Sequence, residues 1–418
     1  MAEPVCIGLD VGTSGVRGCA VTDQKAVLAQ ANTTITADQR RSPAAILAAT
    51  HSVLRGLAAK IGGDCRGIVV SGTSGSFVAL DRDGTPIGPL SLYSDRPTPK
   101  AGNRAWELVS RRRESGVSPD VLARLIDRTA DDQVATISFE TDYVAASLAK
   151  RRLPTDFNSG LKAGADPVNG HWAGWLDEIG LRLEGFPELV EPGSPVTPMD
   201  SAMARDLGFR NAPMLFAGTT DGCASALAAG VTETGDAVTS LGSTLVLKVV
   251  SDRRITSQDH GVYSHRILGR WLVGGASNAG GAVLRQIFGD TELERLSRIP
   301  IASAPSKTRY VPLTHSGERF PVVDPYLIPR LIPRLPDDSE YFLALIDSLV
   351  RWERRGYTTL ETLIGKKVTK IAAVGGGVQN AAWMQTRARD LDYQHVTPLS
   401  TEPAFGAGLL ALRNGAFN

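Results

Sequence analysis

Two short segments combine glycine with hydroxyl-bearing side chains directly after β-prone runs. They are Asp10-Val-Gly-Thr-Ser14 and Gly242-Ser-Thr244. Glycine lets the backbone turn tightly, so that N–H groups and hydroxyls can converge on one anion. Either segment alone is compatible with an ordinary hairpin turn. Because two of them occur in corresponding halves of the chain, the pair favours phosphate binding.

Asp10 changes the chemistry that is expected at the first of these turns. A carboxylate beside a phosphate repels it unless a cation lies between the two groups. Mg²⁺ commonly binds to substrate phosphates and dehydrates reluctantly, so it keeps several of its waters. Asp10 therefore predicts a Mg²⁺ site that the carboxylate reaches through water.

Asp221 is a candidate general base. It lies in the segment Gly218-Thr-Thr-Asp-Gly222, between an apolar run and an alanine-rich stretch that is typical of a helix. A hydroxyl is a poor nucleophile until its proton has somewhere to go, and a carboxylate opposite a terminal phosphate can accept that proton. The alternative is a carboxylate that only stabilises the first turn of the helix through its dipole.

A third glycine-rich segment, Gly375-Gly-Gly377, follows an apolar strand, and Asn380 comes one helical turn later. Glycines at this place allow a flat ligand to lie close to the backbone. A plain strand-to-helix turn is the alternative. The segment Gly406-Ala-Gly-Leu-Leu-Ala411 matches a dinucleotide pattern, but it lies inside an expected helix, so we reject that interpretation. The sequence contains no Walker loop.

The elements that position these residues follow from hydrophobic runs and turn residues. Each half of the chain starts with antiparallel strands around a glycine-rich tip and continues into helices. The expected strands are 5–9, 16–21, 27–34, 66–70, 77–80, 90–93, 214–217, 237–241, 245–250, 261–265, 271–274, 370–374 and 395–399. Helices are expected after Ser42-Pro43, Gly222, Gly281, Asp338, Asn380 and Glu402. Two such halves predict an α/β fold with mixed sheets flanked by helices.

Composition limits the possible functions. The chain has 418 residues, enough for two or three domains of roughly 100–200 residues each. Its 45 Lys and Arg against 44 Asp and Glu give a formal net charge of +1, which supplies no global field for nucleic acid or an anionic membrane. We therefore expect neither as a partner.

The four cysteines stand singly, so we expect reduced, buried thiols rather than a zinc site or a disulfide framework. The sequence shows no signal peptide and no apolar stretch of the ~18 residues that a membrane span needs. A cytoplasmic location is expected.

Taken together and in order, the motifs resemble those of the FGGY carbohydrate kinases. The segments that carry the resemblance are Asp10-Val-Gly-Thr-Ser-Gly15, Gly218-Thr-Thr-Asp-Gly222, Thr239-Ser-Leu-Gly-Ser-Thr244, Gly274-Gly-Ala-Ser-Asn278 and Val374-Gly-Gly-Gly-Val-Gln-Asn380. The resemblance spans almost the whole chain. It implies the actin-like ATPase fold, a duplicated ribonuclease-H-like fold with a central cleft. It also implies an N-terminal sugar-binding domain, 1–228, with which a helix at about 400–418 packs, and a C-terminal ATP-binding domain, 229–418.

The resemblance also implies roles for single residues. It makes Asp221 the catalytic base and a sugar ligand, Asp10 a carboxylate of the sugar and Mg²⁺ sites, and Ser74 a sugar contact. The residues that would lie against the phosphates are Gly12, Thr13, Ser14, Gly242, Ser243 and Thr244, with Thr13 at the transferring phosphate. Those that would face the adenosine are Gly376, Gly377 and Asn380. ATP and Mg²⁺ are the expected cofactors.

Within the family the sequence is most similar to the short D-ribulose kinases and xylulose-kinase-like proteins. Longer xylulose kinases carry a Gln-Met-His sugar loop where this chain has Thr73-Ser-Gly75, which weakens the expectation of a D-xylulose preference. Tyr93-Ser-Asp-Arg96 keeps an Asp-Arg pair that longer members use near the sugar. Asp95 is therefore a candidate substrate residue, with an exposed ion pair as the alternative.

The expected reaction is phosphorylation of a terminal hydroxyl of a ketopentose, with D-ribulose ahead of D-xylulose. The alternatives are a D-xylulose kinase or another polyol kinase of the family, a nucleotide-dependent sugar sensor without turnover, and an actin- or chaperone-like mechanical ATPase. The sequence leaves the sugar's stereochemistry and the oligomeric state open.

Overall fold

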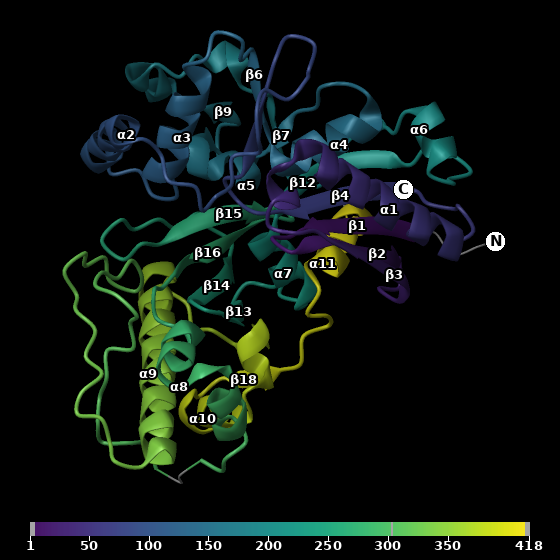
Figure 1. Cartoon of the computed structure of the whole chain (residues 1–418). Helices are drawn as coiled ribbons and strands as arrows, with labels where there is room; N and C mark the ends of the chain where they lie inside the picture. The colour runs from purple at the N-terminus through teal and green to yellow at the C-terminus, as the bar shows by residue number, and fades with distance from the viewer. Residues whose placement is uncertain (1–4, 302–303, 414–418) are drawn as a thin grey trace. The chain divides into compact units, whose positions relative to one another are not determined.

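The computed structural model describes residues 5–301 and 304–413 (Figure 1). The chain divides into two compact units. Unit 1 comprises the described residues up to Ala228, the hairpin His265–Gly269, and the chain from Glu402 onwards. Unit 2 comprises Ala229–Ser264 and Arg270–Thr401. Both units are α/β, as the sequence predicts.

Unit 1 is built on a six-stranded mixed sheet in the order β11-β12-β4-β1-β2-β3. The strands are β1 (Val5–Val11), β2 (Gly15–Thr22), β3 (Val27–Thr34), β4 (Gly67–Gly72), β11 (Pro195–Pro198) and β12 (Met214–Thr220). The pairs β1–β2 and β2–β3 are antiparallel, whereas β1, β4 and β12 run parallel. The glycine-rich tip thus joins the first two strands of an antiparallel meander, as expected.

Side-chain alternation along these strands sends neighbouring residues to opposite faces of the sheet. On one face, Ile7 and Leu9 share a buried cluster with helix α1 (Pro43–Lys60). On the other, Gly8 faces helix α11 (Pro403–Arg413), because a Cβ on Gly8 would lie 1.9 Å from the Ala404 carbonyl oxygen. The expected last helix is therefore present to Arg413, and residues 414–418 lie outside the described part.

Helix α11 also packs against α7 (Asp221–Ala228), which follows β12. A Cβ on Gly406 would lie 1.8 Å from the Ala224 carbonyl oxygen, and one on Gly408 would lie 3.0 Å from Val21. These two glycines let a helix approach a helix and a sheet closely. Their segment lies inside a helix, as the sequence predicts, and its glycines serve packing.

The stretch between β4 and β12 holds smaller elements. They are β5 (Phe77–Leu80), α2 (Pro99–Arg112), α3 (Pro119–Thr129), β6 (Thr136–Phe139), α4 (Glu140–Ala149), β7 (Thr155–Asp156), α5 (Phe157–Gly160), β8 (Ala165–Asp166), β9 (His171–Trp172), β10 (Leu189–Val190) and α6 (Ser201–Asp206). Short 3-10 helices lie at η1 (Gln39–Arg41), η2 (Leu161–Ala163), η3 (Gly174–Ile179) and η4 (Leu183–Gly185). The expected strand 90–93 is wrong: only Ser91 forms an isolated bridge, with Phe77.

Unit 2 repeats this topology. Its strands run β16-β14-β13-β17-β18, with two antiparallel pairs followed by two parallel ones. They are β13 (Asp236–Leu241), β14 (Leu245–Ser251), β16 (Arg270–Ala276), β17 (Lys370–Val374) and β18 (Gln394–Val396). The boundary between the units falls after Ser264, within strand β15 (Tyr263–Ile267), so that each unit contains part of this strand. The two glycine-rich tips indicate that the chain contains a duplicated fold, and the matching order and directions of the strands in the two sheets confirm this duplication.

Helices α8 (Gly281–Leu296), α9 (Asp338–Ile364) and α10 (Ala381–Asp390) complete unit 2, with a 3-10 turn, η5 (Gly376–Gln379), before α10. Apolar residues of α9, such as Leu345 and Leu349, form the centre of the unit's core. Figure 1 shows α9 as the long light-green helix.

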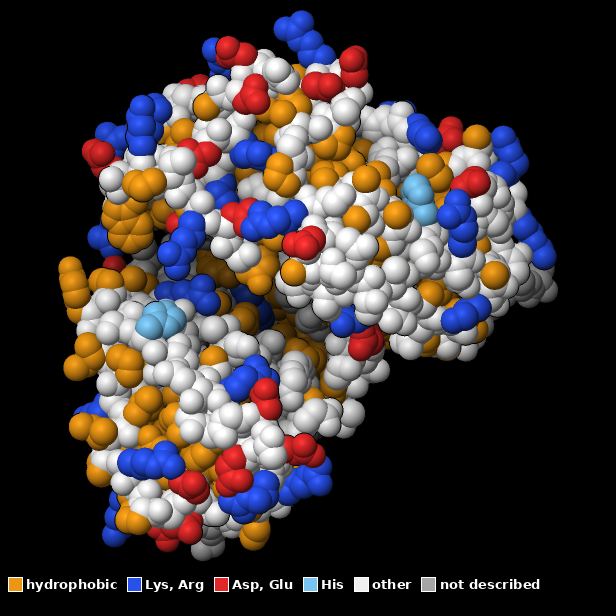
Figure 2. Space-filling model, in the orientation of Figure 1, with side chains coloured by type: hydrophobic (Ala, Val, Ile, Leu, Met, Phe, Trp, Pro, Cys, Tyr) orange, Lys and Arg blue, Asp and Glu red, His pale blue; other side chains and the backbone are white. Residues whose placement is uncertain are grey.

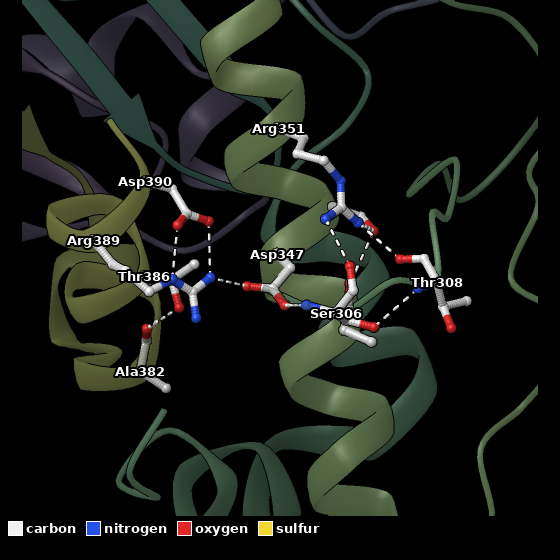
Figure 3. A network of polar contacts seen from close by, with 10 residues as sticks. Ser306, Thr308, Asp347, Arg351, Ala382, Thr386, Arg389 and Asp390 are labelled. Carbon is white, nitrogen blue, oxygen red and sulfur yellow. Dashed lines mark hydrogen bonds and ion pairs between the residues drawn. The ribbon is translucent and has the colours of Figure 1, made fainter. Parts of the chain in front are cut away.

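Charged side chains fix α10 to α9. Arg389 of α10 forms an ion pair with Asp347 of α9, and Asp347 accepts a hydrogen bond of 2.6 Å from the Ser306 N–H (Figure 3). Arg351 of α9 donates to the carbonyl oxygens of Ser306 and Thr308, at 3.3 and 2.8 Å. One network thus holds α10 and the segment 306–308 on the same helix.

On the face shown in Figure 2, basic and acidic side chains are interspersed over the surface of each unit. All four cysteines are buried and none of them forms a disulfide, as predicted. None of the helices within residues 5–301 and 304–413 is long and apolar enough to cross a membrane.

Candidate active site

Strand pairing brings the two candidate carboxylates of unit 1 to one edge of the sheet. In the register of the parallel strands, Asp10 of β1 faces Ser71 of β4, and Thr220 of β12 faces Gly72. Asp221 is the next residue after Thr220. Ligands of α/β proteins bind at the carboxyl ends of parallel strands. Asp10 and Asp221 therefore lie on either side of β4 at the edge where a ligand is expected.

Asp10 is almost fully buried, with 3% of its surface exposed. Its Oδ1 accepts a hydrogen bond of 3.2 Å from the Ser71 hydroxyl, and its Oδ2 lies 3.9 Å from Nη1 of Arg17. Burial and then the charge of Asp221 raise the pKa of Asp10 to about 7, against the hydrogen bond from Ser71. A nearby cation would stabilise the ionised form of this carboxylate.

Asp221 begins helix α7, as predicted. Its Oδ1 accepts a 2.6 Å hydrogen bond from the N–H of Gly222. Burial raises the pKa of Asp221, while the Gly222 N–H and the positive charge of Lys162 act in the opposite direction. A carboxylate with a raised pKa is a stronger base than an ordinary aspartate, so this group can accept a proton from an alcohol.

The first hairpin tip is held by its own backbone. The Gly12 N–H donates to the Gly15 carbonyl oxygen at 2.9 Å, and the Ser14 carbonyl oxygen accepts from the Ile35 N–H at 3.0 Å. The side chains of Thr13 and Ser14 are exposed. Their hydroxyls are therefore accessible three and four residues after Asp10.

Ser74 lies in the loop that follows β4. Its hydroxyl oxygen is buried and has no hydrogen-bond partner in the described structure. Its carbonyl oxygen accepts a 3.3 Å hydrogen bond from Nζ of Lys162. Because a buried unpaired hydroxyl is costly, this atom is suited to bind a ligand.

Asp95 is bound to Arg41, as in the ion-pair alternative. Two guanidinium hydrogen bonds from Arg41 measure 3.1 and 2.5 Å, and the Leu92 N–H donates a third, of 2.9 Å. Burial alone would raise the pKa of Asp95, but the hydrogen bonds from Arg41 and Leu92 lower it below its usual value. None of the hydrogen bonds of Asp95 reaches Asp10, Ser74 or Asp221. Among the described residues, Asp95 is therefore not linked to the other candidate site residues of unit 1 by a hydrogen bond.

Unit 2 contains a cavity of about 650 Å³. Five of the six residues predicted there for nucleotide binding line it, and Thr244 does not. The five are Gly242, Ser243, Gly376, Gly377 and Asn380. Its other walls include Leu284 and Leu293 of α8, and Trp383 of α10. Charged side chains, among them Arg285 and Glu294, also line it, so segments separated by more than a hundred residues meet at one cavity with mixed walls and several glycines.

The glycines of this cavity have different physical roles. A Cβ on Gly377 would lie 2.7 Å from the Cβ of Leu241 and 2.9 Å from its carbonyl oxygen, so Gly377 is needed for packing on β13. Gly375 has a φ of +89° and approaches the same carbonyl. A Cβ on Gly376 would meet no atom within 4 Å. Gly376 therefore borders open space.

The second tip is anchored to the start of α8. The carbonyl oxygens of Gly242 and Ser243 accept hydrogen bonds from the N–H groups of Gly281 and Ala282, at 2.9 and 3.1 Å. Gly280 makes this contact possible, because a Cβ there would lie 2.5 Å from the Ser243 carbonyl oxygen. The tip is thus fixed beside the cavity.

Asn380 and Trp383 occupy the first turn of α10. The side chain of Asn380 caps the helix by accepting a 3.0 Å hydrogen bond from the Trp383 N–H. The indole Nε1 of Trp383 is buried without a hydrogen-bond partner in the described structure. Trp383 is also one of the residues that line the cavity.

The residues fit the groups that the motifs imply. Asp10 and Asp221 are two mutually repelling carboxylates, which a divalent cation would stabilise. No cluster of three or more His, Cys, Asp or Glu able to hold a metal occurs among residues 5–301 and 304–413. Mg²⁺ uses few protein ligands and keeps several of its waters, so the two carboxylates Asp10 and Asp221 are a suitable set for it. The open space at Gly376 suits a nucleoside.

Sequence reasoning missed several residues of these sites. Ser71, Lys162 and Trp383 were not predicted, although Ser71 precedes the Gly72-Thr-Ser-Gly75 motif and Trp383 follows Asn380 by one helical turn. A search of the residues next to the motifs could therefore have found Ser71 and Trp383. Lys162 comes from η2, and nothing in its local sequence indicates a site.

The comparisons with known proteins agree with this architecture. Residues 237–414 match the model of the FGGY family of carbohydrate kinases, C-terminal domain. A xylulose kinase of Lactococcus lactis is 24% identical, over 97% of this chain and 87% of its own length. A gluconokinase of Bacillus subtilis is 22% identical, over 81% of this chain and 72% of its own. The crystal structure of a xylulose kinase from Rhodospirillum rubrum superposes with a TM-score of 0.84, at 22% identity, covering 98% of this chain and 90% of that one.

The fold is therefore the actin-like ATPase fold of these kinases. Residues 237–414 thus match the C-terminal domain of the FGGY family of carbohydrate kinases, which confirms the resemblance read from the sequence.

Proposed function

We propose that this protein is an ATP- and Mg²⁺-dependent kinase that transfers the terminal phosphoryl group of ATP to a terminal hydroxyl of a ketopentose. The observation that carries the proposal is the pair Asp10 and Asp221 at the carboxyl edge of the parallel strands, with burial raising the pKa of both. Unit 1 would then bind the sugar and unit 2 the nucleotide.

Asp221 would act as the general base. As the sugar oxygen attacks the terminal phosphorus, its O–H proton passes to the Asp221 carboxylate, the new O–P bond forms, and the bond to the leaving ADP breaks. The Gly222 N–H, 2.6 Å from Oδ1, holds the carboxylate in place. The positive charge of Lys162 lowers the pKa of Asp221, against the larger effect of burial.

Asp10 would hold Mg²⁺ through water, and Thr13 and Ser14 would face the transferring phosphate. When bound, Mg²⁺ neutralises charge on the phosphate oxygens and orients them. Asp10 itself would also accept a hydrogen bond from a sugar hydroxyl, and the Ser74 hydroxyl would contact the sugar from the neighbouring strand end.

In unit 2, Gly242, Ser243 and Thr244 would lie against the phosphates. The adenosine would lie in the cavity of about 650 Å³, beside Gly376, Gly377 and Asn380. Apolar walls from α8 suit a planar base, and polar groups at the rim suit a ribose.

Two sugars compete as substrate. The small loop Thr73-Ser-Gly75 favours D-ribulose, whereas the relatives named xylulose kinase favour D-xylulose. One hydroxyl's orientation distinguishes the two, and a site built to hydrogen-bond that group can discriminate strongly.

A coupled ADP-release assay of the purified chain over D-ribulose, D-xylulose, ribitol, arabinitol, gluconate and glycerol tests the proposal. We expect a ketopentose to give the highest kcat/KM, with no activity when Mg²⁺ is chelated. Sugar-independent ADP release with every compound would refute the kinase proposal. A gluconate or glycerol preference would refute the ketopentose.

A further inference from the structure

A buried ion pair lies beneath the loop that carries Ser74. Arg40 of η1 and Glu140, the first residue of α4, are a hundred residues apart in sequence and are 3% and 1% exposed. Both guanidinium Nη atoms bind the Glu140 carboxylate, one of them at 2.9 Å. Such bidentate pairs fix geometry as well as charge.

Thr73 connects this pair to the loop. Its hydroxyl donates a hydrogen bond of 2.9 Å to Oε2 of Glu140, and it also accepts from Nη2 of Arg40 at 3.3 Å. Its oxygen lies 2.8 Å from the hydroxyl oxygen of Ser76. Because Thr73 has only one proton and gives it to Glu140, Ser76 must be the donor in that contact.

Ser76 completes the chain of hydrogen bonds. Its hydroxyl oxygen accepts from the Tyr93 N–H at 3.0 Å, and its carbonyl oxygen accepts from the Glu140 N–H at 3.1 Å. From the opposite side, Arg124 of α3 donates to the Gly75 carbonyl oxygen at 2.8 Å. The loop is thus held at nearly every residue.

Ser74 is the exception. Of the three hydroxyls in residues 73–76, those of Thr73 and Ser76 are saturated by the network, whereas the Ser74 hydroxyl is buried without a partner. A loop so tightly fixed around one unpaired hydroxyl presents that group in a single orientation. Preorganisation of this kind raises affinity, because the ordering cost is met before binding.

We infer that Arg40 and Glu140 are positioning residues that act through Thr73 to hold the Ser74 hydroxyl ready for a sugar hydroxyl. This inference rests on the proposed function, since it assigns the loop's ligand as the sugar. Neither residue touches the substrate. The pair sets the affinity for the sugar and leaves the nucleotide side unaffected.

The substitution Thr73→Val tests the inference without unpairing two buried charges. It keeps the side-chain shape and removes the single hydroxyl that links the ion pair to the loop. We expect the KM for the preferred ketopentose to rise about tenfold, the equivalent of one hydrogen bond to a charged group. The kcat and the KM for ATP should stay within about twofold, and Thr73→Ser should restore the KM for the sugar.

Thr136→Val is the matched control. Thr136 is a half-buried threonine of the same unit, and its hydroxyl donates to the Gly185 carbonyl oxygen at 2.7 Å, away from the loop. Its KM values should equal those of the unaltered chain. If Thr73→Val leaves the KM for the sugar unchanged, or changes kcat and the KM for ATP as much as the KM for the sugar, the inference is wrong.

Hydrogen exchange of the ligand-free protein separates this inference from the proposed function. The Tyr93 N–H and the amides of residues 73–76 should exchange faster in Thr73→Val and Glu140→Gln than in the unaltered chain. If hydrogen exchange is faster in these variants but the protein turns over no sugar, the proposed kinase function is wrong. The positioning of the loop by Arg40 and Glu140 is then still supported. Unchanged exchange overturns the positioning whatever the activity.

Discussion

Arg387 donates two hydrogen bonds to the Glu353 carboxylate, at 2.9 and 2.8 Å, and only 1% of either side chain is exposed. Glu353 also accepts a 2.5 Å hydrogen bond from the hydroxyl of Thr239. The pair therefore joins α10, which carries Asn380, to α9 and to β13, which ends at the second tip. It thus joins two elements that line the cavity of unit 2, β13 and α10, to the long helix α9.

Glu353→Gln should destabilise the protein by about 3–5 kcal/mol, because it leaves the buried Arg387 charge without its partner. Denaturant unfolding followed by intrinsic fluorescence measures the change. Glu292→Gln, which breaks an exposed pair with Arg295, is the control and should have no measurable effect. Equal stability of the two variants would show that the buried pair contributes nothing.

Asp221→Asn should lower kcat by roughly 10²–10⁴-fold while calorimetric binding of the sugar and of ATP persists. The asparagine keeps the size of the side chain and cannot accept the proton. Asp206→Asn, at an exposed ion pair with Arg55, should leave kcat unchanged. Substantial turnover by Asp221→Asn would exclude this residue as the base.

The activity of the unaltered chain should decline on the acid side at a higher pH than an ordinary aspartate predicts. The base works only when it is ionised, and burial raises the pKa of Asp221 above the ~3.9 of a free side chain. A profile of kcat/KM against pH tests this. An acid limb at the usual aspartate pKa would contradict the burial of the base.

Gly376 and Gly377 should respond in opposite ways to alanine. Gly377→Ala forces a Cβ against the Leu241 backbone and should lower the melting temperature. Gly376→Ala meets no atom and should leave the melting temperature unchanged, while its methyl group, at the rim of the cavity, raises the KM for ATP. Thermal unfolding and ATP titrations of both variants distinguish these effects. The prediction is contradicted if Gly377→Ala raises the KM for ATP without lowering the melting temperature. It is also contradicted if Gly376→Ala lowers the melting temperature.

A buried carboxyl pair in unit 1 should make stability depend on pH. Asp142 and Asp156 are 4% and 0% exposed, and Oδ2 of each has no hydrogen-bond partner in the described structure. Burial and then the charge of Asp156 raise the pKa of Asp142 well above its usual value, and burial raises that of Asp156 to about 6.

The folded protein consequently holds more protons than the unfolded chain between about pH 4 and the raised pKa values. The free energy of unfolding should therefore fall as the pH rises through that interval. Asp142→Asn should flatten this decline, and the exposed Asp206→Asn should not. Denaturation curves at pH 5 and at pH 8 measure the two slopes, and parallel slopes for Asp142→Asn and the unaltered chain would refute the prediction.

The sequence predicted those parts of the structure that depend on short-range patterns. Hydrophobic runs and turn residues defined β3 and β17 with the bounds that the structure has. Ser42 caps α1 through a 3.2 Å hydrogen bond from the Ala45 N–H, as its position before a proline indicates. The order of the glycine-rich motifs predicted the family, and the comparisons confirm it.

Long-range contacts were beyond such patterns. Strand β12 continues to Thr220, beyond the apolar run 214–217, because β4 offers it partners up to Gly72. Arg40 and Glu140 each look like an ordinary surface charge in their local sequence, and only the fold brings them together. The structure pairs Asp95 with Arg41, a partner that the local sequence around Asp95 does not indicate. The roles of the remaining site residues and the ligands of each unit stay predictions.

The contact between Gly8 and α11 orders events during synthesis. Strand β1 of unit 1 packs against α11, which follows the last residue of unit 2, Thr401. The face of β1 at Gly8 is therefore covered only once residues 403–413 have been synthesised and folded. A variant truncated before Glu402 would leave that face exposed.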